Sequence, residues 1–162
     1  MNYQTTSSIN EETKKESKKK NGKNNLNSKP TSAYVGASWG ALTIGLVSYC
    51  IGLWNATMEL NEKGFYFVIL LMGIYAVISL QKAVRDKAEE IKVSEMYYGI
   101  SWVVVLAAIL LLFIGLRNAD LLLSEKGFYG MSFLLSLFGA ITVQKNTRDI
   151  DFINKKIEEE KS

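Results

Sequence analysis

The side chains best suited to chemistry in this sequence are four acids in two short segments, Glu59, Glu62, Asp120 and Glu125. They could form a carboxylate cluster, but we expect them to be solvated. The 162 residues include no His, the commonest general base and metal ligand, and one Cys, Cys50, within an apolar block. Because catalysis needs perturbed titratable groups or a metal held in a pocket, we predict no enzyme activity and no catalytic, cofactor or metal site.

The segments that must position these acids are four long apolar blocks without any Asp, Glu, Lys or Arg. At about 1.5 Å rise per residue, the two shorter blocks span roughly 25 Å as helices and the longer ones more than about 30 Å, enough to cross a bilayer. We therefore predict an all-α, polytopic membrane protein with four transmembrane helices and the lipid bilayer as its first partner. The blocks are Ala33–Trp54, Gly64–Leu80, Met96–Leu116 and Gly127–Val143.

The alternatives to this fold are a soluble helical bundle and a β-barrel. A soluble helix needs a polar face that recurs every 3.6 residues, whereas residues 103–116, VVVLAAILLLFIGL, are apolar on every side. Barrel strands would be about ten residues long and would alternate apolar with polar residues. Neither pattern is present in the four blocks.

The basic residues are distributed unequally around the blocks. Residues 1–32, residues 82–95 and the segment after Val143 hold 16 Lys and Arg, whereas the two remaining loops hold three. This asymmetry predicts that both termini and the middle loop are cytoplasmic. The tail, residues 1–32, is too poor in apolar side chains to fold, so we expect it to be disordered and the first helix to be an uncleaved anchor. Its Lys cluster lacks interleaved aromatics, which argues against nucleic-acid binding.

The chain repeats itself at an offset of 63 residues. Ile51–Asp86 and Ile114–Asp149 share 17 of 36 residues without a gap. Each unit crosses twice, so both units have the same orientation, related by a pseudo-two-fold axis along the membrane normal. This predicts two tandem helical hairpins in parallel orientation. The expected divisions are a tail at 1–32, a first repeat at 33–86, a linker at 87–95, a second repeat at 96–149 and a charged tail at 150–162.

The matched positions gather in the motifs GLxNA, EKGFY and QKxxRD, for which structural roles are the simpler explanation. The Asn residues would end helices, the Gly of EKGFY would permit a turn, and the acids Asp86 and Asp149 would pair with Lys82 and Lys145 four residues earlier. The functional alternative is a paired binding surface outside the membrane. Its candidate residues are Asn55, Glu62, Lys63, Gly64, Asn118, Glu125, Lys126 and Gly127.

Small residues follow one narrow face of the first block. Ala37, Ala41, Gly45, Ser48 and Gly52 are spaced by steps of four, four, three and four. Small side chains let helices approach closely in lipid, so this is a candidate helix-packing face. The equivalent positions of the third block are bulkier. We therefore predict that the first helix is central in the bundle and the third more exposed to lipid.

The repeated motifs GLWNAxxxLNEKGFY and GLxNAxLLLSEKGFYG resemble the YiaA/YiaB family of bacterial inner membrane proteins over roughly residues 33–150. This resemblance implies a four-helix protein of the bacterial inner (cytoplasmic) membrane with two copies of a two-helix unit, and it implies no reaction. The second unit departs from the first at Arg117, where the first has Trp54. The N-terminal tail lies outside the resemblance.

Two functions are compatible with the sequence. The first is a non-catalytic membrane protein that acts by helix packing, as a homo-oligomer or within a larger membrane complex. The alternative is a small-molecule transporter or channel formed by a homo-oligomer, with Trp39, Tyr49, Tyr75 and Trp102 as candidate lining residues. The four blocks carry no acid and no His, which argues against proton coupling.

Overall fold

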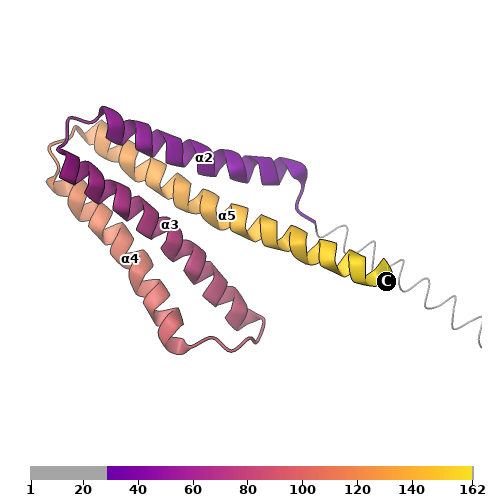
Figure 1. Ribbon diagram of the computed structural model, residues 1–162. Helices are drawn as coiled ribbons and strands as arrows, with labels where there is room; N and C mark the ends of the chain where they lie inside the picture. Colours follow the sequence, from indigo (N-terminus) through magenta and orange to yellow (C-terminus); the bar gives the residue numbers. More distant parts are fainter. Residues whose placement is uncertain (1–28, 162) are drawn as a thin grey trace, which may run out of the picture. The chain divides into compact units, whose positions relative to one another are not determined.

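The computed structural model describes residues 29–161, and residues 1–28 of the predicted disordered tail lie outside this range. This part of the chain is all-helical, as predicted, and each of its four helices is long and apolar enough to cross a membrane. The contacts divide the described residues into 35–144 and a second unit that contains 29–34 and 145–161. The helices are α2 (Ser32–Asn55), α3 (Leu60–Ala88), α4 (Glu95–Asn118) and α5 (Leu123–Lys161) (Figure 1).

The second helix of each repeat begins earlier than its apolar block. In α3 the backbone N–H of Glu59 donates to Oε2 of Glu62 at 3.1 Å. In α5 the N–H of Leu122 donates to Oε2 of Glu125 at 2.8 Å. A carboxylate in the first turn that accepts a bond from the residue before the helix is half of a capping box. Both copies of the motif EKGFY therefore lie in the first turns of a helix, one in α3 and one in α5.

The glycines of this motif do not make the turn back into the membrane, so that prediction was wrong. Gly64 and Gly127 lie inside α3 and α5, and no glycine among residues 29–161 has a positive φ. A Cβ added at either position would have no neighbour within 4 Å. The capping carboxylates, seven residues after the last residue of the preceding helix, end the turn instead.

The lysine of the same motif stabilises the end of the preceding helix. Lys63 Nζ donates to the carbonyl oxygen of Trp54 at 3.2 Å. The equivalent Lys126 Nζ donates to the carbonyl oxygen of Arg117 at 3.5 Å. The last carbonyls of a helix have no partner within it, so a cation that reaches them is favourable. Asn55 adds a bond from Nδ2 to the carbonyl oxygen of Ile51 at 2.9 Å.

Within residues 35–144, the first helix of each repeat packs on the second helix of the other repeat. A Cβ added at Gly52 would lie 2.8 Å from Cε1 of Phe128, and one at Gly115 would lie 2.9 Å from Cε1 of Phe65. These two contacts are equivalent under the 63-residue offset. Figure 1 shows the same pairing, with α2 alongside α5 and α4 alongside α3.

The closest approach lies between α2 and α5. A Cβ added at Gly139 would stand 2.5 Å from backbone atoms of Leu42, and one at Gly45 would stand 2.6 Å from the backbone nitrogen of Ser136. No larger side chain fits at either position without a shift of a helix. Dispersion between surfaces this close holds helices together in lipid, where water exclusion supplies no driving force.

The first helix is not more central than the third, so this prediction was also wrong. In the 18-residue apolar stretch of α2, 17% of the residues are buried, whereas in the corresponding stretch of α4 28% are buried. The buried positions are equivalent, with Ser38 and Gly45 in α2 matching Ser101 and Ala108 in α4. The repeat fixes which face of each helix turns inward, and side-chain size does not change it.

The centre of the bundle is filled by aromatic and aliphatic side chains. The rings of the equivalent Tyr66 and Tyr129 are stacked, with centroids 6.1 Å apart and an interplanar angle of 17°. Tyr49 is fully buried, packs edge-on against Tyr129 at 5.5 Å, and donates its hydroxyl to the carbonyl oxygen of Tyr66 at 3.1 Å. Its counterpart in the second repeat is Leu112, so the symmetry of the core is broken here.

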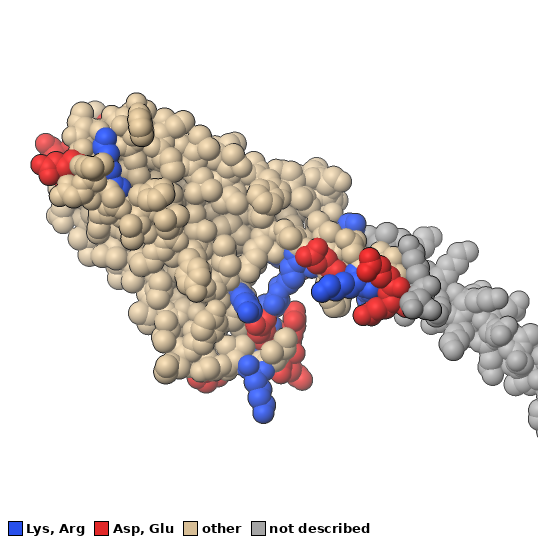
Figure 2. All heavy atoms as spheres, viewed as in Figure 1, with Lys and Arg blue, Asp and Glu red and all other residues tan. Residues whose placement is uncertain are grey.

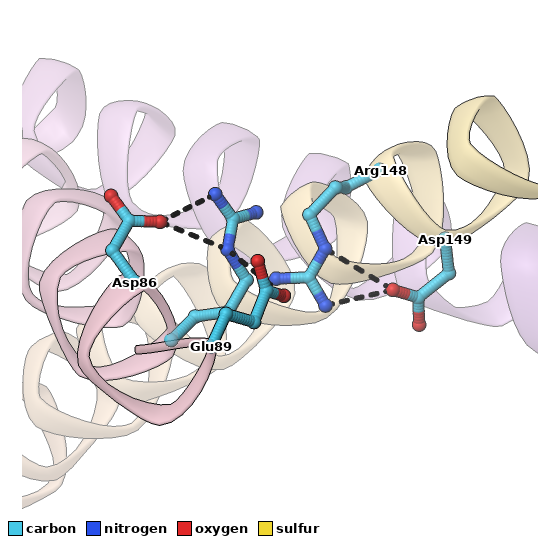
Figure 3. A network of polar contacts seen from close by, with 5 residues as sticks. Asp86, Glu89, Arg148 and Asp149 are labelled. Atoms are coloured by element: carbon cyan, nitrogen blue, oxygen red, sulfur yellow. Dashed lines mark hydrogen bonds and ion pairs between the residues drawn. The ribbon is translucent and has the colours of Figure 1, made fainter. Parts of the chain in front are cut away.

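The RD pairs lie within the second helix of each repeat and have the same geometry. Nη2 of Arg85 lies 2.8 Å from Oδ1 of Asp86, and Arg148 repeats this distance to Asp149 (Figure 3). The predicted Lys partners of these two aspartates are replaced by the adjacent arginines, whose forks reach the carboxylate from one residue away. Because these pairs are partly exposed, each contributes at most about 1 kcal/mol.

Charged side chains are scarce on the middle of the helices. On the face that Figure 2 shows, the acidic and basic atoms of residues 35–144 gather at the two ends, and the surface between them is uncharged. Large apolar residues of the helices, such as Val103, Phe113 and Leu134, are more than half exposed. This is the surface expected of a bundle that lipid tails solvate.

Replacement of Gly139 by Ala should lower stability by about 1–3 kcal/mol, because the new methyl group meets the backbone of Leu42. Gly64→Ala is the matched control, since its methyl group meets nothing and Ala favours a helix by about 0.5–1 kcal/mol. Thermal unfolding in mild detergent measures both effects. Equal stability of the two variants would contradict the close α2–α5 contact.

Tyr49→Phe should cost about 0.5–1.5 kcal/mol, because it leaves the carbonyl oxygen of Tyr66 without its buried donor. Tyr75→Phe is the control, since Tyr75 is 71% exposed. The same unfolding experiment compares them, and an unchanged midpoint for Tyr49→Phe would show that this bond adds nothing.

Candidate functional site

Two equivalent pockets lie at the end of residues 35–144 that carries the loops 56–59 and 119–122, here called the paired-loop end. The α3–α4 pocket has a volume of about 290 Å³ and the α2–α5 pocket about 300 Å³. The first is lined by Asn61, Glu62, Phe65, Tyr66, Gly115, Asn118 and Ala119. The second is lined by Ser124, Glu125, Phe128, Tyr129, Gly52, Asn55 and Ala56.

The two linings correspond residue by residue at the 63-residue offset. Six of the seven positions hold the same residue type, and the seventh pairs Asn61 with Ser124. Each pocket takes four residues from the second helix of one repeat and three from the end of the first helix of the other. Both sites therefore depend on the cross-repeat packing, and neither repeat contains a whole pocket.

The predicted surface residues are divided among several places. Glu62 and Asn118 meet in the α3–α4 pocket, and Glu125 and Asn55 meet in the α2–α5 pocket. The glycines and lysines of the motif line neither of them. Lys63 and Gly64 border a separate hollow, and Lys126 and Gly127 are their counterparts in the second repeat.

Each pocket places a carboxylate beside a phenol on one helix face. Oε2 of Glu62 is the atom that accepts the capping bond, and no hydrogen bond to its Oε1 is seen among the described residues. Tyr66 is only 3% exposed, and a Cβ at Gly115 would lie 3.1 Å from its hydroxyl oxygen. Gly115 thus leaves the space that the pocket occupies.

The α2–α5 pocket repeats this arrangement with one difference. Glu125 caps through Oε2 and Tyr129 is again 3% exposed, while a Cβ at Gly52 would lie 3.4 Å from the ring carbon Cζ of Tyr129. The side-chain amide of Asn55 donates from Nδ2 to the carbonyl oxygen of Ile51. Both pockets offer acceptor oxygens and ring faces, and neither lining includes a Lys or Arg.

The separate hollow lies between α2 and α3 and is mostly apolar. Its volume is about 700 Å³, and its lining is Cys50, Leu53, Trp54, Leu60, Lys63, Gly64 and Phe67. In the second repeat Phe113 replaces Cys50 and Gly130 replaces Phe67. The repeat therefore does not preserve this hollow as it preserves the twin pockets.

The aromatic residues proposed to line a transport path do not converge. Tyr49 is fully buried in the core, whereas Trp39, Tyr75 and Trp102 are 53%, 71% and 43% exposed. Within residues 29–161, no group of three His, Cys, Asp or Glu is placed to hold a metal ion.

Gly52 was predicted only as part of a helix-packing face, and Tyr66, Tyr129 and Gly115 were not predicted as site residues. Glu62 and Tyr66 are spaced i,i+4 and so share a helix face, but Glu62 was expected to lie outside the apolar block that begins at Gly64. The retention of Gly52 and Gly115 in both repeats was a further signal. Nothing in the sequence indicated that they would face the rings of the opposite repeat.

Comparisons with known proteins agree with the two repeats. The family model described as "yiaA/B two helix domain" matches residues 34–86 and 97–149. The inner membrane protein YiaA of Escherichia coli K12 is 55% identical over 72% of this chain and 81% of its own length. The inner membrane protein YiaB of the same organism is 30% identical over 59% of this chain and 81% of its own length.

An uncharacterized membrane protein of Bacillus subtilis 168, YubF, is 36% identical over 37% of this chain and 70% of its own length. No solved structure matches. The double match to the two-helix domain and the identity to YiaA show that this chain belongs to the YiaA/YiaB family of inner membrane proteins.

Proposed function

We propose that this inner membrane protein is a non-catalytic binding protein that holds a ligand or partner at its paired-loop end. The observation that carries this proposal is the pair of pockets, in which six of seven lining residues are the same in both repeats. By contrast, only two of the fourteen positions from Phe67 to Leu80 match their counterparts. Packing against lipid accepts any apolar residue, whereas a polar site does not.

The chemistry of the pockets supports binding over catalysis. Each lining contributes a single carboxylate, Glu62 or Glu125, and one oxygen of that carboxylate already caps a helix. Side-chain amide and hydroxyl groups accompany it in both pockets. Such groups orient a ligand by hydrogen bonds, as small-molecule sites generally do.

The packing also favours binding over transport through a single chain. Tyr49, Leu70 and Phe133 are at most 1% exposed and fill the centre of the helices. Transport would then need a passage between copies in a homo-oligomer. We propose that such copies associate through the exposed apolar faces, and that any flux is secondary to binding.

We further propose that the paired-loop end faces the outside of the cytoplasmic membrane, because the segments between the apolar blocks at this end, residues 55–63 and 117–126, hold three of the 19 basic residues. The ligand would then come from the periplasmic side, and both termini would be cytoplasmic.

Cysteine labelling tests this orientation. In a Cys50→Ala background, Thr57→Cys and Asp120→Cys should react with a membrane-impermeant maleimide in intact spheroplasts. Lys92→Cys, in the α3–α4 loop, should react only after lysis, because the positive-inside rule places it in the cytoplasm. The reverse pattern would show that the topology is inverted.

Native mass spectrometry in mild detergent tests the binding role. The full chain should carry an additional bound mass beyond its 18.2 kDa, and Asn55→Ala with Asn118→Ala should reduce its occupancy at least about tenfold, since amide partners are lost from both pockets. Thr57→Ala, at the same end but outside both linings, is the control. A bound mass that survives the double change, or substrate flux into vesicles with no bound species, would contradict the proposal.

A further inference from the structure

We propose that each of the twin pockets binds an organic ammonium group, so that one chain binds two. This inference rests on the proposed binding function and specifies its ligand class. It is carried by the juxtaposition of Glu62 with Phe65 and Tyr66 in one pocket, and of Glu125 with Phe128 and Tyr129 in the other.

The charge of the pockets favours a cation. The lining of each pocket contains one carboxylate and no basic side chain. The nearest lysines along the sequence, Lys63 and Lys126, direct their Nζ atoms at the carbonyls of Trp54 and Arg117. They therefore neutralise helix ends, and neither of these Nζ atoms is bonded to a pocket carboxylate in the described part of the chain.

The aromatic rings favour an organic cation in particular. Phe65 and Tyr66 meet edge to face, with centroids 5.4 Å apart and an interplanar angle of 74°. Phe128 and Tyr129 repeat this at 5.9 Å and 75°. Phe65 and Phe128 are 42% and 45% exposed, so their rings are partly open beside the carboxylates, and a ring face attracts an ammonium group with its carbon substituents.

The glycines and the volume set the size of the ligand. A Cβ at Gly115 or Gly52 would stand under 3.0 Å from a phenylalanine ring carbon, so only glycine lets the helix end pack this closely against the rings that line each pocket. A volume of about 290–300 Å³ is at the small end for ligand sites. It admits an ammonium group with a few carbon atoms. A bare metal ion would find only one carboxylate there.

The ammonium group has two sources that share this chemistry. It could be a free small amine outside the membrane or the headgroup of an aminophospholipid, because the pockets lie at the ends of membrane-spanning helices. Ethanolamine is a probe for both, since it is a free amine and also the headgroup of phosphatidylethanolamine.

Calorimetric titration of the full chain in nanodiscs of phosphatidylglycerol tests the proposal. Ethanolamine should bind at two sites per chain, and ethylene glycol, which lacks the charge, should not bind. Glu62→Gln with Glu125→Gln should weaken ethanolamine binding at least about tenfold, because the charge-assisted contacts are lost. Gln preserves the capping bond that each carboxylate makes, so the fold remains. Either single variant should leave one site.

Glu59→Gln with Asp120→Asn is the matched control, because it removes two charges from the same end outside both linings. Unchanged binding in the Glu62 and Glu125 double variant, or an equal loss in the control, would overturn the proposal. Gly52→Ala with Gly115→Ala should also abolish binding by filling the pockets, independently of charge. Binding that persists in this second variant would place the amine elsewhere.

Nanodiscs that contain phosphatidylethanolamine distinguish the two sources. If the headgroup is the ligand, this lipid should reduce ethanolamine binding in the unmodified chain and should be retained by it, but not by the Gln double variant, in native mass spectrometry. If a free amine is the ligand, the lipid should change nothing. Should neither form bind while another bound mass is lost with Asn55→Ala and Asn118→Ala, the ammonium assignment falls and the binding function stands.

Discussion

The arrangement of residues 35–144 depends on one contact that occurs twice, a glycine of one repeat against the aromatic rings of the other. Gly52 accepts Phe128 and Tyr129, and Gly115 accepts Phe65 and Tyr66. This contact brings the end of a first helix against the start of a second helix. It thereby sets the pairing of α2 with α5 and of α4 with α3, and it leaves the two hollows beside the rings. A side chain at either glycine would separate the helices and occupy the site together.

The cross-repeat pairing gives the duplication a physical meaning. Each two-helix unit leaves its own pockets incomplete, because a pocket needs the helix end of the other unit. A chain with only one such unit would have to associate with a second copy to complete the same contacts. Joining two units in one chain makes this association intramolecular, which removes the entropy cost of bringing two chains together. It also allows the halves to diverge, as Tyr49 and Leu112 have done in the core.

The sequence was sufficient for the number of helices, their membrane class and the repeat, because uninterrupted apolarity and a constant offset are local signals. The sequence did not indicate which helices pack against one another. The predicted central position of the first helix rested on side-chain size at Gly45 and Gly52, but the structure buries equivalent faces of α2 and α4. Likewise, Gly64 suggested a turn, whereas the capping bond of Glu62 shows that the helix had already begun. Capping and pairing depend on neighbours in space, which spacing alone does not reveal.

The distribution of identity between the repeats follows from these contacts. Glu62, Lys63, Phe65 and Tyr66 each have a partner whose geometry tolerates little change, namely a capping bond, a helix-end carbonyl or a glycine surface. The following residues of α3 mainly meet apolar side chains or lipid, where size and not identity matters. Capping alone would require only the acid, and helix-end neutralisation only the lysine. The joint retention of the acid, both aromatic residues and the facing glycine, in both repeats, is also what we expect of the binding pockets that we propose.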